Sequence, residues 1–155
     1  MTARLSACVL ALALCGCERL SPGLTEAEVQ EFVRQYVAAS NGFDAGKVMG
    51  FIQKDEAVSS VGLGTIYRGW NAISTATDRA FTEEVRIKLT VGTLDVARLG
   101  NDTAIAVASM SVTSTQPIQI GRNWMTDAPG AMTIVVRRTP EGLRVIHEHY
   151  SLRPV

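Results

Sequence analysis

Cysteine is absent from most of this chain. Its three cysteines, Cys8, Cys15 and Cys17, all lie within the first 17 residues. The remaining residues therefore cannot form a disulfide, a thiolate zinc site or a redox CxxC motif. They also contain no cysteine nucleophile.

An excess of positive charge is missing as well. The chain has 15 basic and 15 acidic residues and no formal net charge. Proteins that bind nucleic acid neutralise its phosphates with clustered lysines and arginines, so nucleic acid is not an expected partner. The adjacent bases Arg137 and Arg138 fall in a predicted strand, where successive side chains point to opposite faces. We expect each of them to be solvated or paired.

The apolar run near the N-terminus is too short to cross a bilayer. It follows a single base, Arg4, and contains about a dozen residues, whereas a membrane-spanning helix needs about 20. It ends in a small residue directly before a cysteine. We therefore predict that residues 1–16 are a secretory signal peptide.

The sequence LCGC at 14–17 resembles the bacterial lipobox, whose cysteine becomes the acylated first residue of the mature protein. Leu14 and Gly16 fit the motif, whereas Cys15 is an uncommon but small residue at its position. The alternative is an ordinary signal peptide with chance cysteines.

This resemblance implies a palmitoylated Cys17, a tether at 17–24 and a membrane-anchored protein that faces the periplasm. Glu18 follows the cysteine in place of the aspartate that retains lipoproteins in the inner membrane. The outer membrane is therefore the favoured location within the cell envelope.

Residues 25–155 predict one α+β domain that begins with three helices. Thr25 and Glu28 form a capping box, and apolar residues at helical spacing extend the first helix to Asn41. A second helix over 45–53 is capped by Asp44. A short hairpin follows around Gly62 and Gly64, and then a third helix over 71–83.

From Val85 the apolar pattern changes from helical spacing to alternation or continuous runs. This change predicts four long antiparallel strands at 85–99, 103–115, 131–138 and 143–152. The segment GRNWMTDAPG at 121–130 is predicted to be a loop between strands. Its Trp124 is a candidate ligand contact at the mouth of a pocket, or alternatively part of a lid packed on the first helix.

The order of these elements resembles the SnoaL-like branch of the nuclear transport factor 2-like superfamily. The residues that carry the likeness are Tyr36, GFDAGKVMGFI at 42–52, Gly69 and EGLRVIHEHYS at 141–151. The likeness covers about 25–153. Where many relatives have tryptophan after the turn glycine, this chain has Leu143.

The resemblance implies a cone-shaped fold, in which three N-terminal helices and a curved antiparallel sheet enclose a pocket. The family contains isomerases, dehydratases, polyketide cyclases and epoxide hydrolases, and also members that only bind or assemble. The fold therefore leaves function open.

Both histidines of the chain lie in the last predicted strand, two residues apart. Strict alternation places five residues on one face, and its apolar members mark that face as the concave wall of the pocket: Leu143, Val145, His147, His149 and Ser151. Glu148 is then expected on the opposite face.

Three roles remain open for His147 and His149. Imidazoles at this spacing are about 6.6 Å apart along a strand, which is wide for adjacent metal ligands, and no metal site is predicted. As general acids or bases they could be tuned toward neutral pH. As structural groups they would hydrogen-bond polar neighbours on the concave wall.

The predicted pocket is short of carboxylates, which family isomerases and cyclases use as general bases. We therefore expect a small apolar ligand or an interaction module, without a cofactor. The ligand contacts expected are Tyr36, Trp124, His147, His149 and Ser151, although Tyr36 also fits core packing. The alternative is an isomerase, dehydratase or hydrolase with a histidine base.

The strands at 103–112 and 132–136 are apolar on both faces. An antiparallel sheet that met water on one side would normally carry polar residues there. A homodimer that covers the convex face is therefore expected.

Overall fold

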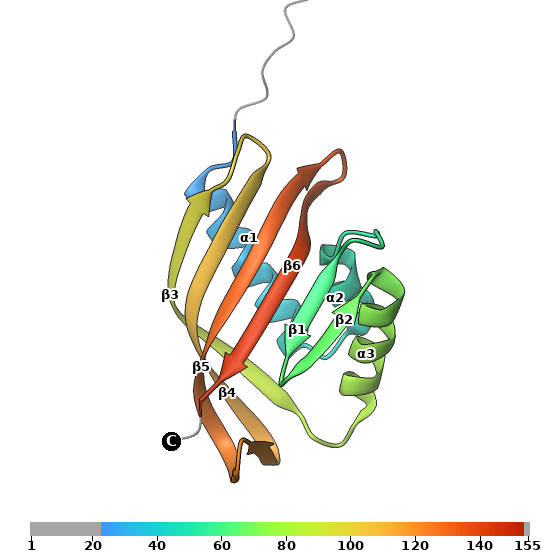
Figure 1. Cartoon of the computed structure of the whole chain (residues 1–155), viewed down its shortest axis with the longest axis vertical. Coiled ribbons are helices and arrows are strands. Elements are labelled where there is room, and N and C mark those ends of the chain that lie inside the picture. The colour runs from blue at the N-terminus through green and yellow to red at the C-terminus, as the bar shows by residue number, and fades with distance from the viewer. Residues whose placement is uncertain (1–22, 154–155) are drawn as a thin grey trace, which may run out of the picture.

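The computed structural model describes residues 23–153 and shows three helices packed on one side of a six-stranded sheet (Figure 1). The elements in chain order are α1 (Glu26–Asn41), α2 (Ala45–Phe51), β1 (Ser59–Gly62), β2 (Thr65–Arg68), α3 (Trp70–Thr82), β3 (Ile87–Arg98), β4 (Thr103–Ile120), β5 (Asn123–Thr139) and β6 (Gly142–Leu152). The strand order is β2-β1-β6-β5-β4-β3. Only β1 and β6 run parallel; the other neighbours are antiparallel. The predicted α+β class, with three helices against a curved sheet, is confirmed.

The predicted signal peptide and Cys17 lie outside the described residues. Leu24 already packs against the domain. Leu24 is fully buried, and its backbone N–H donates to the carbonyl of Asn101 at 3.1 Å. Within residues 23–153, no helix combines the length and hydropathy needed to cross a membrane.

Helices α1 and α2 begin directly after the residues predicted to cap them. Thr25 Oγ1 accepts from the backbone N–H of Glu28 at 3.3 Å, and Asp44 Oδ1 accepts from that of Lys47 at 3.0 Å. Both oxygens of the Glu28 carboxylate also accept from Arg138 Nη2, each at 2.8 Å. This bond ties the first turn of α1 to β5, and it confirms that Arg138 is paired.

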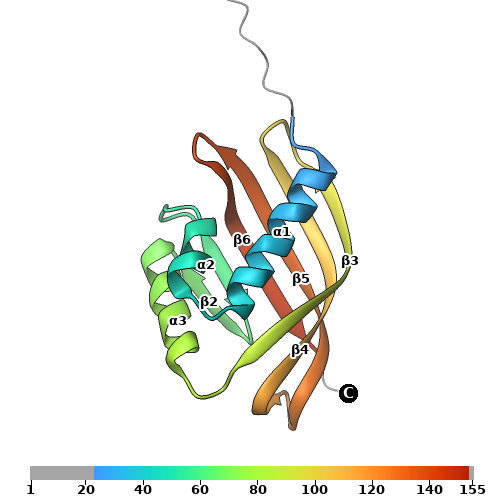
Figure 2. The same ribbon diagram turned by 180° about the vertical axis from the view of Figure 1, so that it is seen from behind.

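The core lies between α1 and the concave face of the sheet, which α1 crosses obliquely (Figure 2). Small side chains of β4 face this core, because Ala104, Ala106 and Ala108 are almost completely buried. They let the helix lie close to the sheet. Larger residues of α1 and β5 fill the remaining space: Val29, Val33, Val37, Met132, Ile134 and Val136.

Strands β4 and β5 are longer than predicted, and the loop predicted at 121–130 is wrong. Apart from its first two residues, that segment belongs to β5, and Trp124 pairs with Gln119. Pairing resumes there after a register irregularity between Thr113 and Ile118. Gly130 lies within this strand for a packing reason, because a Cβ there would collide with the carbonyl of Ser151 in β6.

Candidate functional site

A β-bulge in β6 decides which side chains face the concave wall. Val136 pairs with Val145, but the preceding residue of β5, Val135, pairs with His147. Ile146 is therefore the extra residue of the bulge. Because side chains alternate with a period of two, one inserted residue exchanges the faces of everything that follows.

The prediction that His147 and His149 line the concave wall is therefore wrong. His147 is half-buried on the convex side, where its Nδ1 and the Ser59 Oγ of β1 are 2.8 Å apart. His149 is exposed on the same side, and so is Ser151. Glu148, predicted to face away, instead points into the molecule.

Glu148 is the centre of a buried cluster of hydroxyl groups. The residue is 5% exposed, and its Oε2 accepts from the hydroxyl of Tyr36 at 2.6 Å and from that of Tyr150 at 2.9 Å. Its Oε1 accepts from Ser60 Oγ at 2.6 Å. Three elements, α1, β1 and β6, thus supply one carboxylate and three donors. The predicted shortage of inward carboxylates does not hold.

Both tyrosines of this cluster stay protonated. Burial raises the pKa of Tyr36 well above its ordinary value of 10.0, and the negative charge of Glu148 raises it further. The pKa of Tyr150 is raised well above 10.0 by the same two causes. Each hydroxyl therefore remains a donor to the carboxylate across the physiological range.

The cluster lies on the wall of an open pocket of about 420 Å³ between the helices and the concave face of the sheet, called the chamber below. That volume falls within the usual range for small-molecule sites, which is about 300–1,000 Å³. The chamber walls are mostly apolar and come from all three helices and the sheet: Val48, Ile73, Ala76, Ala80, Phe81, Leu89, Met110, Val112 and Leu152. Tyr36 is thus both a buried core residue and a chamber residue, as its two open interpretations allowed.

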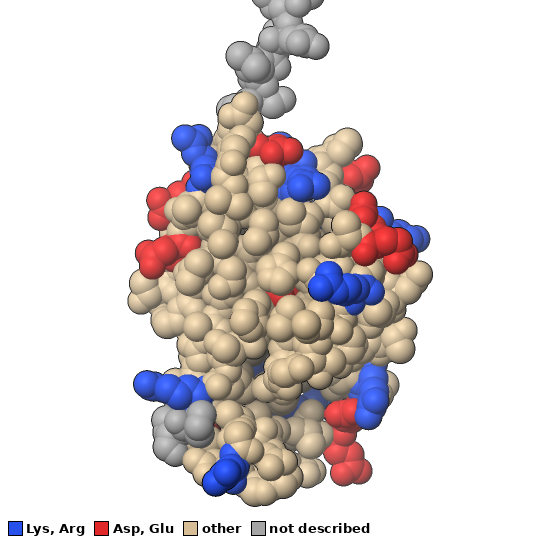
Figure 3. Space-filling model, viewed as in Figure 1, with Lys and Arg blue, Asp and Glu red and all other residues tan. Residues whose placement is uncertain are grey.

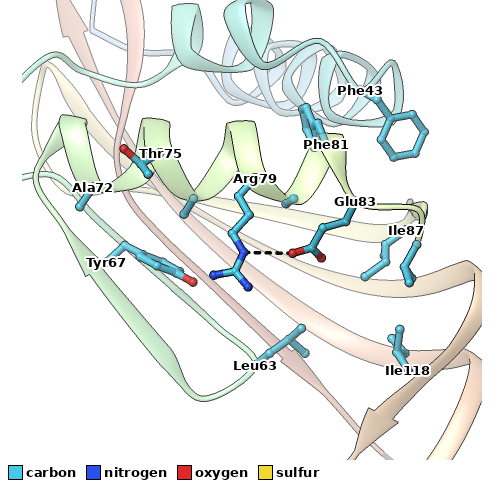
Figure 4. A pocket seen from close by; sticks show the side chains of 13 residues that line it. Phe43, Leu63, Tyr67, Ala72, Thr75, Arg79, Phe81, Glu83, Ile87 and Ile118 are labelled. Atoms are coloured by element: carbon cyan, nitrogen blue, oxygen red, sulfur yellow. Dashed lines mark hydrogen bonds and ion pairs between the residues drawn. The ribbon is translucent and has the colours of Figure 1, made fainter.

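A second pocket of about 840 Å³, called the vestibule below, adjoins the chamber and shares part of its lining, including Tyr67 and Phe81. Figure 4 shows this vestibule between α3, the β1–β2 hairpin and the ends of β3 and β4. Its charged side chains, Arg79 and Glu83, pair with each other at 3.1 Å (Figure 4). The two charges that line the vestibule therefore offset each other.

Trp124 does not line the chamber or the vestibule. It is 68% exposed near the tip of the β4–β5 hairpin, beside a separate shallow hollow that includes Pro117 and Arg122. Of the five predicted ligand contacts, the structure brings only Tyr36 to the chamber. Within residues 23–153, no three or more His, Cys, Asp or Glu side chains are grouped so that they could hold a metal ion.

The model of the SnoaL-like domain family matches residues 29–155, and the chain therefore belongs to this family. Three solved structures illustrate the likeness. One, a protein with a cystatin-like fold from Caulobacter vibrioides, is 19% identical with a TM-score of 0.67, covering 83% of this chain and 89% of that one. A nuclear transport factor 2-like superfamily protein from Salmonella enterica is 18% identical with a TM-score of 0.66, covering 83% and 91%.

The third is a protein of the nuclear transport factor 2-like family from Streptomyces avermitilis, named for a suggested dehydratase activity. It is 17% identical with a TM-score of 0.70, covering 83% of this chain and 97% of that one. At these identities the likeness establishes the fold alone. None of the curated proteins matches this chain.

Proposed function

We propose that this SnoaL-like domain binds a small, largely apolar ligand in the chamber, with the Glu148 cluster holding a polar group of that ligand. The observation that carries the proposal is the combination of an unfilled apolar chamber of about 420 Å³ with one buried carboxylate on its wall. A cone that served only as an interaction scaffold would gain stability from side chains filling this space.

The direct test is to fill the chamber. Ala76 lies on α3 and lines both chamber and vestibule, so Ala76→Trp places an indole where the ligand would lie. We expect a neutral apolar fluorescent probe, N-phenylnaphthylamine, to bind the domain saturably, and the variant to weaken binding by at least about tenfold.

Ala38→Trp is the matched control, because Ala38 is an exposed residue of α1 and does not line the chamber. It should bind the probe as the unaltered domain does. Equal binding by both variants, or no saturable binding by the unaltered domain, would refute a ligand site in the chamber.

A second candidate is proton-transfer catalysis in the same chamber, with Glu148 in the role that the sequence suggested for a histidine. It is favoured by the position of Glu148, which lines the chamber between two tyrosine hydroxyls. We rank it second because three of the roughly four acceptor positions of the carboxylate are already occupied by hydroxyl donors. One position is then left for a substrate proton.

We also propose that a lipid on Cys17 tethers the domain to the periplasmic side of a bacterial membrane. The outer membrane is the favoured one. The support is the lipobox-like LCGC at 14–17 at the end of the apolar segment. Cys17→Ala is expected to abolish incorporation of labelled palmitate. Incorporation unchanged by this substitution would rule out acylation at this residue.

Two copies of the domain are proposed to pair through the convex face of the sheet. Strand register aligns Ile66, Val61, His149, Thr133 and Val107 in one row across β2, β1, β6, β5 and β4. Ile66 is 59% exposed and Val107 is 45% exposed on this face. Figure 3 views the same side of the sheet and shows charged side chains gathered mainly around its edges.

The expected result is that the domain without residues 1–22 sediments as a dimer at micromolar concentration. Val107→Asp should shift it to a monomer, because the carboxylate would be buried without a partner. Arg34→Asp, on the exposed side of α1, should leave the dimer intact. A monomer before any substitution would contradict the pairing.

A further inference from the structure

Seven hydroxyl groups line the chamber. Those of Thr65 and Tyr67 donate to no acceptor within residues 23–153, whereas the other five have committed their hydrogens. Three of them donate to Glu148, as described above. Ser40 Oγ donates to the carbonyl of Tyr36 at 3.1 Å, and Thr77 Oγ1 donates to that of Ile73 at 2.9 Å. The lone pairs of these hydroxyl oxygens remain. Around the cluster, the chamber therefore offers acceptors to a ligand and few donors.

The chamber also carries one uncompensated charge. Among its lining residues, all of which the structure describes, Glu148 is the only charged one. Within residues 23–153 it makes no ion pair with a lysine or arginine. The one basic residue that lines the vestibule, Arg79, pairs with Glu83 at 3.1 Å. A buried carboxylate is ordinarily paired, and here the protein supplies hydroxyl donors but no cation.

From these two observations we infer that the ligand carries an N–H-bearing ammonium group, which binds at Glu148 while its apolar body fills the chamber. This inference rests on the proposed function and names its ligand class: an amphiphilic primary or secondary amine. The ammonium would donate to the remaining acceptor position of the carboxylate and to the hydroxyl oxygens around it.

The aromatic lining fits the same class. Four aromatic side chains line the chamber, namely Tyr36, Tyr67, Phe81 and Tyr150. Aromatic rings attract cations through their negative faces, and this attraction is stronger in a site shielded from water. An acidic ligand would instead meet the charge of Glu148 with no basic residue of the lining to offset it.

Three ligands with one apolar body test the inference: naphthylmethylamine, naphthylmethanol and naphthoic acid. Isothermal titration of the domain at neutral pH should show the amine binding at least about tenfold more tightly than the alcohol. The acid should bind most weakly. Glu148→Gln should remove the preference for the amine, while Glu141→Gln, at the exposed β5–β6 turn, should retain it.

The order of the three ligand affinities in the unaltered domain tests the inference even if Glu148→Gln fails to fold. An alcohol or acid that binds as tightly as the amine would overturn the inference and leave the chamber as a ligand site. If the neutral probe binds but none of the three ligands does, the inference fails alone. If the neutral probe does not bind either, the proposed function fails with it.

Discussion

Glu148→Ala is expected to lower the free energy of unfolding by about 2–4 kcal/mol, because three hydroxyl groups lose their shared acceptor at once. Each buried donor left without a partner costs about 1–3 kcal/mol. Part of the sum is offset, since the variant no longer buries a carboxylate and water from the chamber can reach the hydroxyls. Urea unfolding of the domain measures the difference.

The control for this prediction is Glu141→Ala. Glu141 is exposed at the β5–β6 turn, and its replacement should change the unfolding free energy by less than about 0.5 kcal/mol. A Glu148→Ala variant as stable as its parent would mean that the carboxylate does not organise Tyr36, Ser60 and Tyr150.

Stability is also expected to fall above about pH 10, and to fall less steeply in Tyr36→Phe. The folded-state pKa values of Tyr36 and Tyr150 are raised, mainly by burial and then by the charge of Glu148. Below the unfolded-state pKa of about 10, both tyrosines are protonated in both states and contribute no pH dependence. Above it, the unfolded chain loses these protons while the folded chain keeps them, so the unfolding free energy decreases with pH.

Tyr36→Phe removes one of the two titrations and leaves Glu148 with one donor fewer. We expect it to cost about 1–3 kcal/mol at neutral pH, and to reduce the alkaline slope. Urea unfolding at a series of pH values measures both effects. Tyr67→Phe, at a tyrosine 37% exposed and outside the cluster, is the control. Parallel curves for the parent and Tyr36→Phe would contradict the raised pKa of Tyr36.

Much of the fold could be predicted because its local patterns and its packing agree. Thr25 and Asp44 cap helices in the structure as their spacing predicted. The alternating apolar residues of 103–112 become the buried row of β4. The hairpin end of β4 and β5 was missed, because Gly121, Pro129 and Gly130 favour loops locally. There, tertiary contact with β6 requires the absence of a side chain at Gly130.

The site could not be predicted in the same way, because it depends on a single inserted residue. Nothing in the composition of VIHEHY marks Ile146 as a bulge, since an isoleucine fits a regular strand equally well. The bulge appears only when the register of β5 against β6 is known. Strict alternation, which takes no account of the bulge, places His147 and His149 on the concave wall in place of Glu148. The chemistry predicted for the pocket changes with that assignment.

The chamber as a ligand site is tested most directly by methyl resonances during titration with the neutral probe N-phenylnaphthylamine. We predict shifts concentrated on methyl groups of the chamber, those of Met110, Val112 and Leu152. The resonances of Val107 and Val135 on the convex face should stay in place. Shifts confined to the convex face, or none at a saturating concentration, would contradict ligand binding inside the cone.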